Sequence, residues 1–369
     1  MSDNPIRFTP LARDLPATVP FVGPEAQERV SGIKFRTRTG ANESGFGPSP
    51  NAITAMQEAV VETWKYGDPE NHDLRVAIAE YHRVEPNNVM IGEGIDGLFG
   101  NLGSLFIEPG VQVVTSLGSY PTFNFHVAAN GGDLHLVPYK NDKEDIPSLL
   151  KKARDVDATL LYFSNPNNPM GTWWSAHEME QMIADLPERT ILVLDEAYVE
   201  LAPDGVAPGI DVSNKQVLRF RTFSKAYGMA GARVGYVLGH SEIVTAFDKV
   251  RNHYGMNRTG QIGAEAALKD EAYLHEIRIK MAAGRERISQ IARDAGLEPI
   301  ASATNFVTID CGRDSAYAKQ ILEKLLERGI FIRMPGVEPQ ARCIRVSVGL
   351  DHELDLFEKE LNAVIKELS

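Results

Sequence analysis

Between residues 111 and 240 the sequence alternates between short apolar segments and amphipathic ones. The apolar segments have the length and the Val, Leu, Ile and Phe content of strands, and the others carry apolar residues at helical spacing. The strand-like segments are 111–116, 134–137, 159–163, 191–194, 217–223 and 234–238, and the helical ones are 121–130, 145–154 and 175–185. This alternation predicts an α/β fold with a mostly parallel sheet between helices, whose ligands bind beyond the carboxyl ends of the strands.

The flanking sequence divides the chain into three parts. Residues 1–41 are rich in Pro, Gly and polar residues and have little periodicity, so we expect an extended arm. Residues 42–241 are expected to form a large domain, which also contains helices near 51–64 and 73–82. Residues 242–369 return to a strand–helix–strand–strand–helix pattern, which predicts a separate small α/β domain on which the arm packs.

Composition argues against several classes of function. The chain of 369 residues has 38 basic and 50 acidic side chains, and its net charge of −12 disfavours nucleic acid or an anionic membrane as a partner. It has no apolar leader and no apolar stretch of membrane-spanning length, so we expect a cytoplasmic protein. Its two cysteines, Cys311 and Cys343, suit a reducing compartment as core residues, and no metal site is expected.

A G-x-G-x-x-G motif at residues 92–97 opens a predicted helix, as in dinucleotide-binding folds. Such a fold needs an acidic residue about twenty positions later to hold the ribose. The candidate strand and its end, residues 111–121, contain no acid. We therefore reject a nicotinamide cofactor and keep only a phosphate site made by backbone N–H groups at this helix N-terminus.

Three polar clusters follow strand-like segments in the order amide, carboxylate, and lysine with arginine. They are NPNNPMG at 165–171, DEAY at 195–198, and the stretch 219–236, which contains Lys225 and Arg233. Each has an ordinary explanation alone, since a strand-end Asp often caps a helix and an Asn–Pro loop often forms a turn. The three clusters together, in this order at one edge of a sheet, form a far more specific pattern than any one of them alone.

Together they meet the requirements of a lysine that forms an imine with an aldehyde cofactor. Lys225 would supply the amine and then move the proton as a general base. Asp195 would keep a pyridine nitrogen protonated, so that the ring accepts electrons. The candidates for the other contacts are Asn168 and Tyr198 at the ring oxygen, Phe123 stacked on the ring, and Ser224, Arg233 and the backbone of Ile95 and Asp96 at the phosphate.

The sequence resembles the pyridoxal-phosphate enzymes of fold type I, which have the aspartate-aminotransferase fold, and among them the histidinol-phosphate aminotransferases. The segment RTFSKAYGMAGARVGY at 221–236 is highly specific by itself. The matching segments are collinear and comprise 42–50, 66–70, 94–97, 121–123, 165–171, 195–198, 221–236, 304–306, 329–333 and 344–349. The resemblance implies a large domain with a seven-stranded, mostly parallel sheet, a small α/β domain, and pyridoxal 5'-phosphate as the cofactor.

The resemblance also implies roles for individual residues. Lys225 would form the Schiff base with the cofactor, and Tyr66 would reach the phosphate from the other subunit, so a homodimer is expected. The residues implied at the substrate are Arg345, Arg333, Phe21, Asn42 and Asn168.

The sequence departs from this family near the substrate pocket. Met170 replaces the Thr usual in NPNNPTG, and Ile95 stands where a small residue or Ser is common. Phe21 stands where a Tyr helps to bind substrate phosphate, and residues 252–258 (NHYGMNR) differ from the usual Pro-Phe-Asn-Val-Asn. The departures leave the cofactor prediction intact and the choice of substrate open.

We therefore expect a ping-pong aminotransferase. Its amino donor would be histidinol phosphate, or an aromatic or other amino acid, and its acceptor a 2-oxo acid such as 2-oxoglutarate. An alternative on the same cofactor is a decarboxylase resembling the threonine-phosphate enzyme of cobalamin synthesis. A transcription regulator with an aminotransferase-like domain would need an N-terminal DNA-binding domain of about seventy residues, for which an arm of about forty residues has no room.

Overall fold

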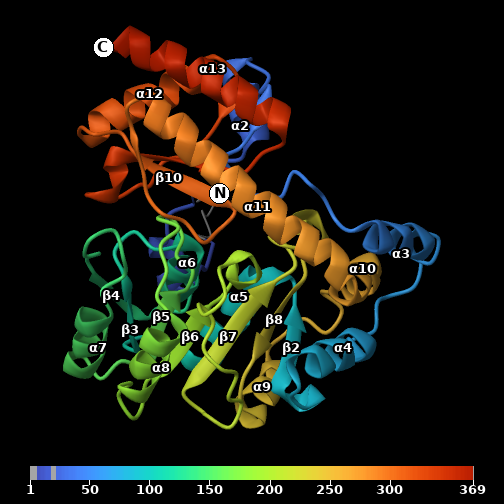
Figure 1. Ribbon diagram of the computed structural model, residues 1–369. Helices are drawn as coiled ribbons and strands as arrows, with labels where there is room; N and C mark the ends of the chain where they lie inside the picture. The colour runs from blue at the N-terminus through green and yellow to red at the C-terminus, as the bar shows by residue number, and fades with distance from the viewer. Residues whose placement is uncertain (1–5, 18–21, 369) are drawn as a thin grey trace, which may run out of the picture.

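The computed structural model describes residues 6–17 and 22–368 and shows a large sheet with helices on both faces (Figure 1). The seven strands have the order β2-β8-β7-β6-β5-β3-β4. Strand β8 is antiparallel to both of its neighbours, and the other strands are parallel. The strands are β2 (Val89–Gly92), β3 (Gln112–Ser116), β4 (Asp133–Val137), β5 (Leu160–Ser164), β6 (Ile191–Asp195), β7 (Val217–Thr222) and β8 (Gly235–Leu238). The predicted fold class, with a mostly parallel sheet of seven strands, is confirmed.

The helices around this sheet lie close to the predicted segments. They are α3 (Pro50–Val60), α4 (His72–His82), α5 (Gly94–Phe106), α6 (Pro121–Ala129), α7 (Ile146–Asp155), α8 (Ala176–Ala184), α9 (Ser241–Ala246) and α10 (Arg258–Lys269), with short 3-10 turns η1 (Pro86–Asn88), η2 (Val199–Leu201), η3 (Ala230–Ala232) and η4 (Phe247–Lys249). Helix α3 ends at Val60, four residues before the predicted end. Side-chain oxygens cap several N-termini, as at Ser175, where Glu178 completes a capping box with α8.

Two hydrophobic cores lie on opposite faces of the sheet, because successive strand residues point to opposite sides. In β5, Leu161 and Phe163 pack with α7 and α8. The alternate residues Leu160 and Tyr162 pack with α5 and α6. All five residues of β5 are buried, which explains why this strand reads as a continuous apolar run rather than as an alternating one.

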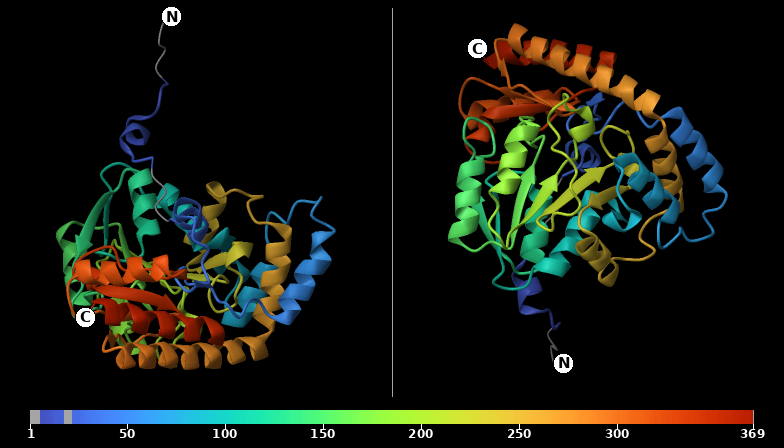
Figure 2. Two further views of the ribbon diagram at one scale, coloured as in Figure 1. Left: turned by 90° about the horizontal axis from the view of Figure 1, so that it is seen from above. Right: turned by 60° about the horizontal axis from the view of Figure 1, so that its bottom comes forward.

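A smaller unit is built on a three-stranded antiparallel sheet in the order β12-β10-β9. The 24-residue helix α11 and the C-terminal helix α13 lie along its outer side (Figures 1 and 2). The elements are α11 (Glu271–Asp294), β9 (Glu298–Pro299), β10 (Phe306–Asp310), α12 (Ser315–Glu327), β11 (Ile330–Phe331), η5 (Gln340–Arg342), β12 (Cys343–Ser347) and α13 (Asp351–Leu368).

The described part of the N-terminal arm contacts this smaller unit. Strand β1 (Thr37–Arg38) pairs in parallel with β11, and Arg36 forms an ion pair with Glu360 of α13. The arm also contains two short helices that its composition did not predict, α1 (Pro10–Asp14) and α2 (Pro24–Ser31). Each begins with a proline at its first position, where a missing N–H group costs nothing.

The helices around residue 242 belong with the large sheet. Helix α10 packs on α3 and α4, and α9 packs on β2. The sequence-based boundary at residue 241 would place both with the small domain, because helical periodicity does not show which neighbour a helix packs on. We propose that the small domain begins within α11, where one continuous core runs from α4 and α10 into α12 and α13. No helix in residues 6–17 and 22–368 is both long and apolar enough to cross a membrane.

Candidate active site

A cavity of about 690 Å³ lies beyond the carboxyl ends of β5, β6 and β7 and reaches into the small domain. Such an edge is where parallel sheets bind ligands. The predicted site residues that line the cavity are Asn42, Ile95, Asp96, Asn168, Asp195, Tyr198, Ser224, Lys225, Arg233, Arg333 and Arg345. The structure therefore brings together residues that are up to about three hundred positions apart in the sequence.

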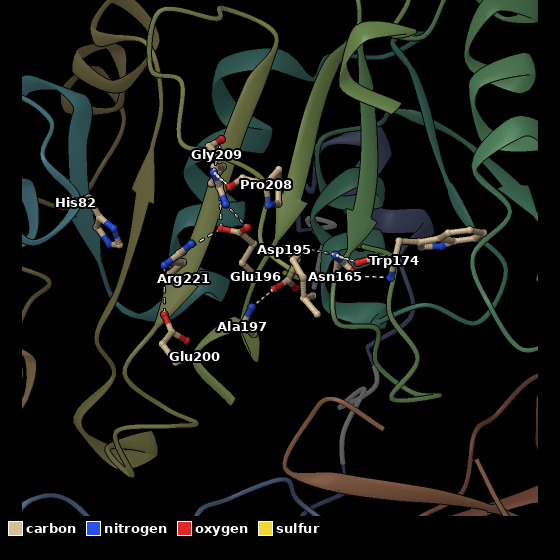
Figure 3. Close-up of polar contacts among 12 residues, drawn as sticks. His82, Asn165, Trp174, Asp195, Glu196, Ala197, Glu200, Pro208, Gly209 and Arg221 are labelled. Carbon is tan, nitrogen blue, oxygen red and sulfur yellow. Dashed lines mark hydrogen bonds and ion pairs between the residues drawn. The ribbon is translucent and has the colours of Figure 1, made fainter. Parts of the chain in front are cut away.

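Asp195, the last residue of β6, is buried and holds two hydrogen bonds. Its Oδ2 accepts from the Tyr162 hydroxyl at 2.7 Å. Its Oδ1 accepts from the Ala197 N–H at 2.9 Å (Figure 3). Burial raises the pKa of Asp195 to about 6, although both hydrogen bonds oppose this rise. A nearby cation would hold the carboxyl in its charged form.

The sequence interpretation missed Tyr162. It lies two residues before the end of β5 and pairs with Val193, so it shares a sheet face with Asp195. The position of Tyr162 could have been noticed in the sequence, because it lies in the strand that leads into the Asn–Pro loop at 165–171, one of the three polar clusters. Burial raises the pKa of the Tyr162 hydroxyl well above its usual range, so it remains a hydrogen-bond donor to Asp195.

Lys225 reaches the cavity from the turn after β7. Its Nζ donates to the carbonyl oxygen of Asn42 at 3.0 Å. Burial and, after it, the positive charge of Arg345 together lower the pKa of Lys225 to about 8. The unprotonated share of this amine near neutral pH is therefore far larger than for an ordinary lysine, as a nucleophile or a general base requires.

A chain of hydrogen bonds connects the two domains across the cavity. The hydroxyl of Tyr198 accepts from Asn42 Nδ2 at 3.0 Å and from Asn168 Nδ2 at 3.3 Å. Asn168 Oδ1 in turn accepts from Arg345 of β12. Asn42 itself has a positive φ of 55° and is anchored by Ser347 Oγ, which accepts from its backbone N–H. Four of the predicted site residues, Asn42, Asn168, Tyr198 and Arg345, thus fix one another's orientation.

Two arginines form the small-domain wall. Arg345 and Arg333 face each other as a backbone pair. The guanidinium carbon of Arg345 lies over the Phe306 ring, 5.0 Å from the ring centroid. Burial lowers the pKa of Arg345 to about 10. Arg333 donates NH2 to the carbonyl of Val22 at 2.7 Å. Two half-buried guanidinium groups beside one cavity favour an anionic ligand.

The opposite end of the cavity has the features of a phosphate site. Helix α5 begins there at Gly94, where φ is +77° and where a Cβ would lie 2.5 Å from Arg233 NH2. The N–H groups of its first turn carry partial positive charge. Ser224 lies beside them and accepts from the hydroxyl of Thr222 at 2.9 Å. Glycine is required here both for the backbone angle and for the approach of the arginine.

Two of the predicted residues that the structure describes, Phe123 and Tyr66, do not line this cavity. Phe123 is 1% exposed and packs in the core, stacked on Tyr162 with ring centroids 4.7 Å apart. Its stacking on the cofactor ring stays a prediction, and Tyr120 is the aromatic residue of this segment that lines the cavity. Tyr66 is 79% exposed on the outer surface, and Phe21 lies outside the described residues.

Comparison with known proteins places the chain in a family. The sequence model of the family Aminotransferase class I and II matches residues 37–356. The chain therefore belongs to the class I and II aminotransferases. Within that family it is a pyridoxal-phosphate-dependent aminotransferase of fold type I, and the comparisons do not favour the decarboxylase alternative.

The similar relatives are histidinol-phosphate aminotransferases. One from Pseudomonas fluorescens is 34% identical over 328 residues, 88% of each chain, and one from Desulfotalea psychrophila is 32% identical over 374 residues, 97% of each. The crystal structure of the Sinorhizobium meliloti histidinol-phosphate aminotransferase with pyridoxal 5'-phosphate is 52% identical, covers 100% of both chains and has a TM-score of 0.96. A Thermus thermophilus aspartate aminotransferase mutant, 21% identical with a TM-score of 0.82, shares the fold.

The donor set in the cavity suits pyridoxal phosphate. It combines a buried carboxyl, a lysine whose pKa is lowered to about 8, and a helix N-terminus with an arginine and a serine. Two buried polar atoms on cavity-lining residues, Asn124 Oδ1 and Arg345 Nε, have no hydrogen-bond partner among the described residues. Because buried polar groups are normally paired, these atoms indicate that the cavity is built for polar ligands.

Proposed function

We propose that this aminotransferase takes the amino group from histidinol phosphate and passes it to 2-oxoglutarate in a ping-pong reaction. The observation that carries the proposal is the pair Arg333 and Arg345, which provides a second anion-binding wall apart from the Arg233 end. The anion-binding end at Arg233 is needed for the cofactor phosphate. The wall of Arg333 and Arg345 suits a phosphate or carboxylate on the substrate. The names of the similar relatives support the same choice of donor.

The chain's own residues would hold the cofactor and move the proton. Pyridoxal phosphate supplies an aldehyde that condenses with amines and a ring that accepts the electrons of a broken C–H bond. Lys225 Nζ would hold the aldehyde carbon and afterwards carry the proton between substrate atoms. We assign Asp195 to the ring nitrogen, Asn168 and Tyr198 to the ring oxygen, Tyr120 to the ring face, and Ser224, Arg233 and the N–H groups of Ile95 and Asp96 to the phosphate.

A screen of amino donors tests the choice of substrate. In a single half-reaction without a 2-oxo acid, histidinol phosphate should bleach the visible absorbance of the bound cofactor faster than any other donor. Arg333→Ala should weaken this donor about tenfold or more, the effect of losing one charge-assisted hydrogen bond of about 1.5 kcal/mol. It should leave phenylalanine nearly unaffected.

A specific observation favours a second donor class. Part of the cavity wall is apolar and would accept an aromatic side chain; it consists of Leu117, Leu136, Met334, Pro335 and Val337. If phenylalanine or tyrosine bleaches the cofactor and histidinol phosphate does not, the donor proposed here is wrong, while the aminotransferase class stands.

The lowered pKa of Lys225 predicts how the cofactor-free protein takes up pyridoxal phosphate. Only the unprotonated amine attacks the aldehyde, so the uptake rate should rise with pH and reach half its maximum near pH 8. An ordinary lysine would reach this point near pH 10.5. Stopped-flow absorbance between pH 6 and about 10.5 gives the midpoint. A midpoint near that of an ordinary lysine would contradict the electrostatics described for this cavity.

We infer a homodimer in the cytoplasm, supported by an exposed apolar surface beside α3. Val61, Trp64 and Tyr66 are 75–79% exposed, and the Tyr66 ring packs on that of Tyr254 at 4.8 Å. A second copy of the chain would cover this surface and place Tyr66 near the partner's phosphate site. Isolated apolar residues are common on surfaces, but a contiguous group of large ones indicates an interface.

Trp64→Asp tests this interface. Sedimentation velocity should show a dimer for the wild-type protein and a dissociation constant raised about thirtyfold or more for the variant, as for the loss of a central tryptophan. Ile279→Asp is the matched control, since Ile279 is 57% exposed on α11. A monomeric wild-type protein, or equal effects of both substitutions, would rule out the proposed interface.

A further inference from the structure

Glu196 follows Asp195 in sequence but lies on the other side of the sheet. Strand β6 pairs with β7 so that Asp195 is opposite Phe220 and Leu194 is opposite Arg219. Side chains alternate along strands, so Asp195 and Thr222 face the cavity, whereas Glu196 shares the other face with Arg219 and Arg221. None of these three lines the cavity.

Two arginines hold the Glu196 side chain, which is 1% exposed. Arg219 donates Nε to Oε2 at 2.9 Å and NH2 to Oε1 at 2.5 Å, and Arg221 donates Nε to Oε2 at 2.9 Å. Arg219 also donates NH1 to the carbonyls of Pro208 and Gly209, both at 3.0 Å. Figure 3 shows Glu196 between Arg221 and the Pro208–Gly209 loop, directly beside Asp195. Glu196 thus connects β6 to β7 and, through Arg219, to the long loop between the two strands.

The charges in this cluster depend on one another. Burial by itself would raise the pKa of Glu196, but Arg219 and Arg221 outweigh burial and lower it to about 2. The carboxylate is therefore charged at every pH at which the enzyme would work. Arg221 also lies 3.7 Å from Glu200 of η2, the turn that directly follows Tyr198. Loss of the Glu196 charge would leave two buried guanidinium groups undercompensated, which is costly in a protein interior.

Backbone pairing between the two strands ends close to this point. The last backbone bond runs from the Glu196 N–H to the carbonyl of Phe220 at 2.9 Å. Beyond it, the chain after β6 leads to Tyr198 and the chain after β7 leads to Lys225, and the cluster of Glu196 with its two arginines lies where the two segments separate. A small shift of one strand end would therefore move Asp195 relative to Lys225 unless the cluster holds both.

We propose that Glu196, clamped by Arg219 and Arg221, is a positioning residue that fixes the end of β6 against β7 and so sets the placement of Asp195 relative to Lys225. The inference rests on the proposed function, which assigns these two residues to the cofactor. It predicts that cofactor binding and orientation depend on a carboxylate that never contacts the cofactor. Outer-shell partners of this kind commonly change affinity by about 10–100-fold in metal sites.

The test compares Glu196→Gln with Glu360→Gln in the full-length protein. Glu360 of α13 is an equally suitable carboxylate for comparison, because it is buried and paired with two arginines, Arg36 at 3.4 Å and Arg328 at 3.2 Å, but lies outside the cavity. Thermal unfolding of the cofactor-free proteins measures the stability cost of each change. Titration with pyridoxal phosphate measures its dissociation constant, and visible circular dichroism reports how the bound ring is oriented.

Glu196→Gln should raise the dissociation constant about tenfold or more and change the visible circular dichroism, whereas Glu360→Gln should lower stability alone. Arg219→Lys provides a milder variant if Glu196→Gln does not fold, because lysine keeps the charge but cannot bond both Glu196 oxygens and the two carbonyls. Equal cofactor affinity and dichroism in the Glu196 and Glu360 variants would overturn the inference. If Lys225→Ala also binds the cofactor like the wild type, the proposed function fails instead.

Discussion

Lys225→Ala should abolish the visible absorbance of covalently bound pyridoxal phosphate and reduce transamination about 10⁴-fold or more. The expected loss is large because one amine performs two tasks, holding the aldehyde carbon and moving the proton, and general acid–base catalysis alone contributes about 10²–10⁴-fold. The pKa of about 8 fits both tasks. Absorbance spectra and single-turnover rates with saturating donor measure the effect.

Lys215→Ala is the matched control for this substitution. Lys215 is exposed, forms an ion pair with Glu242 and lies just before β7, at the opposite end of this strand from Lys225. Its spectrum and rate should equal those of the wild type. A Lys225→Ala variant with an unchanged spectrum would remove the basis for the whole assignment of the site.

Asp195→Asn should reduce transamination about 10²–10³-fold while preserving the fold. Asparagine has the same shape and can still exchange hydrogen bonds with Tyr162 and Ala197, so the substitution removes mainly the negative charge. A preorganised charge in a buried site typically contributes this much to a rate. The burial that raises the pKa of Asp195 to about 6 in the free site also makes its interaction with a bound cation strong.

Tyr162→Phe separates the charge from the hydrogen bond. It removes only the donor to Asp195 Oδ2 and should reduce the rate about tenfold, the equivalent of one hydrogen bond to a charged group. Rates of both variants are measured at saturating donor, and cofactor occupancy is checked by absorbance. If Asp195→Asn retains more activity than Tyr162→Phe, the carboxylate does not act through its charge.

Much of the site could be predicted because parallel strands bring their carboxyl ends to one edge. Ser164 is paired with Asp195, and Asp195 with Phe220. The loops that follow β5, β6 and β7 must therefore meet, whatever their separation in sequence. The residues found by this rule, Asn168, Asp195 and Lys225, all line the cavity.

The rest depended on packing that one sequence does not reveal. Tyr120, directly before α6, and Phe123 within it are both aromatic, and only the tertiary contacts with Tyr162 and Phe99 decide that Phe123 enters the core. Lys225 donates to the backbone carbonyl of Asn42. Every residue type has such a carbonyl, so the sequence does not indicate this contact. The domain boundary at residue 241 stays a prediction for the same reason, because the sequence around it does not show that α10 packs on α3 and α4.

Borohydride trapping tests the central assignment most directly. The wild-type protein is incubated with pyridoxal phosphate, reduced with sodium borohydride, digested and sequenced by tandem mass spectrometry. We predict one phosphopyridoxyl group per chain, located on Lys225 and absent when an excess of the true amino donor is added before reduction. A label on another lysine, or no stable label at all, would contradict the account.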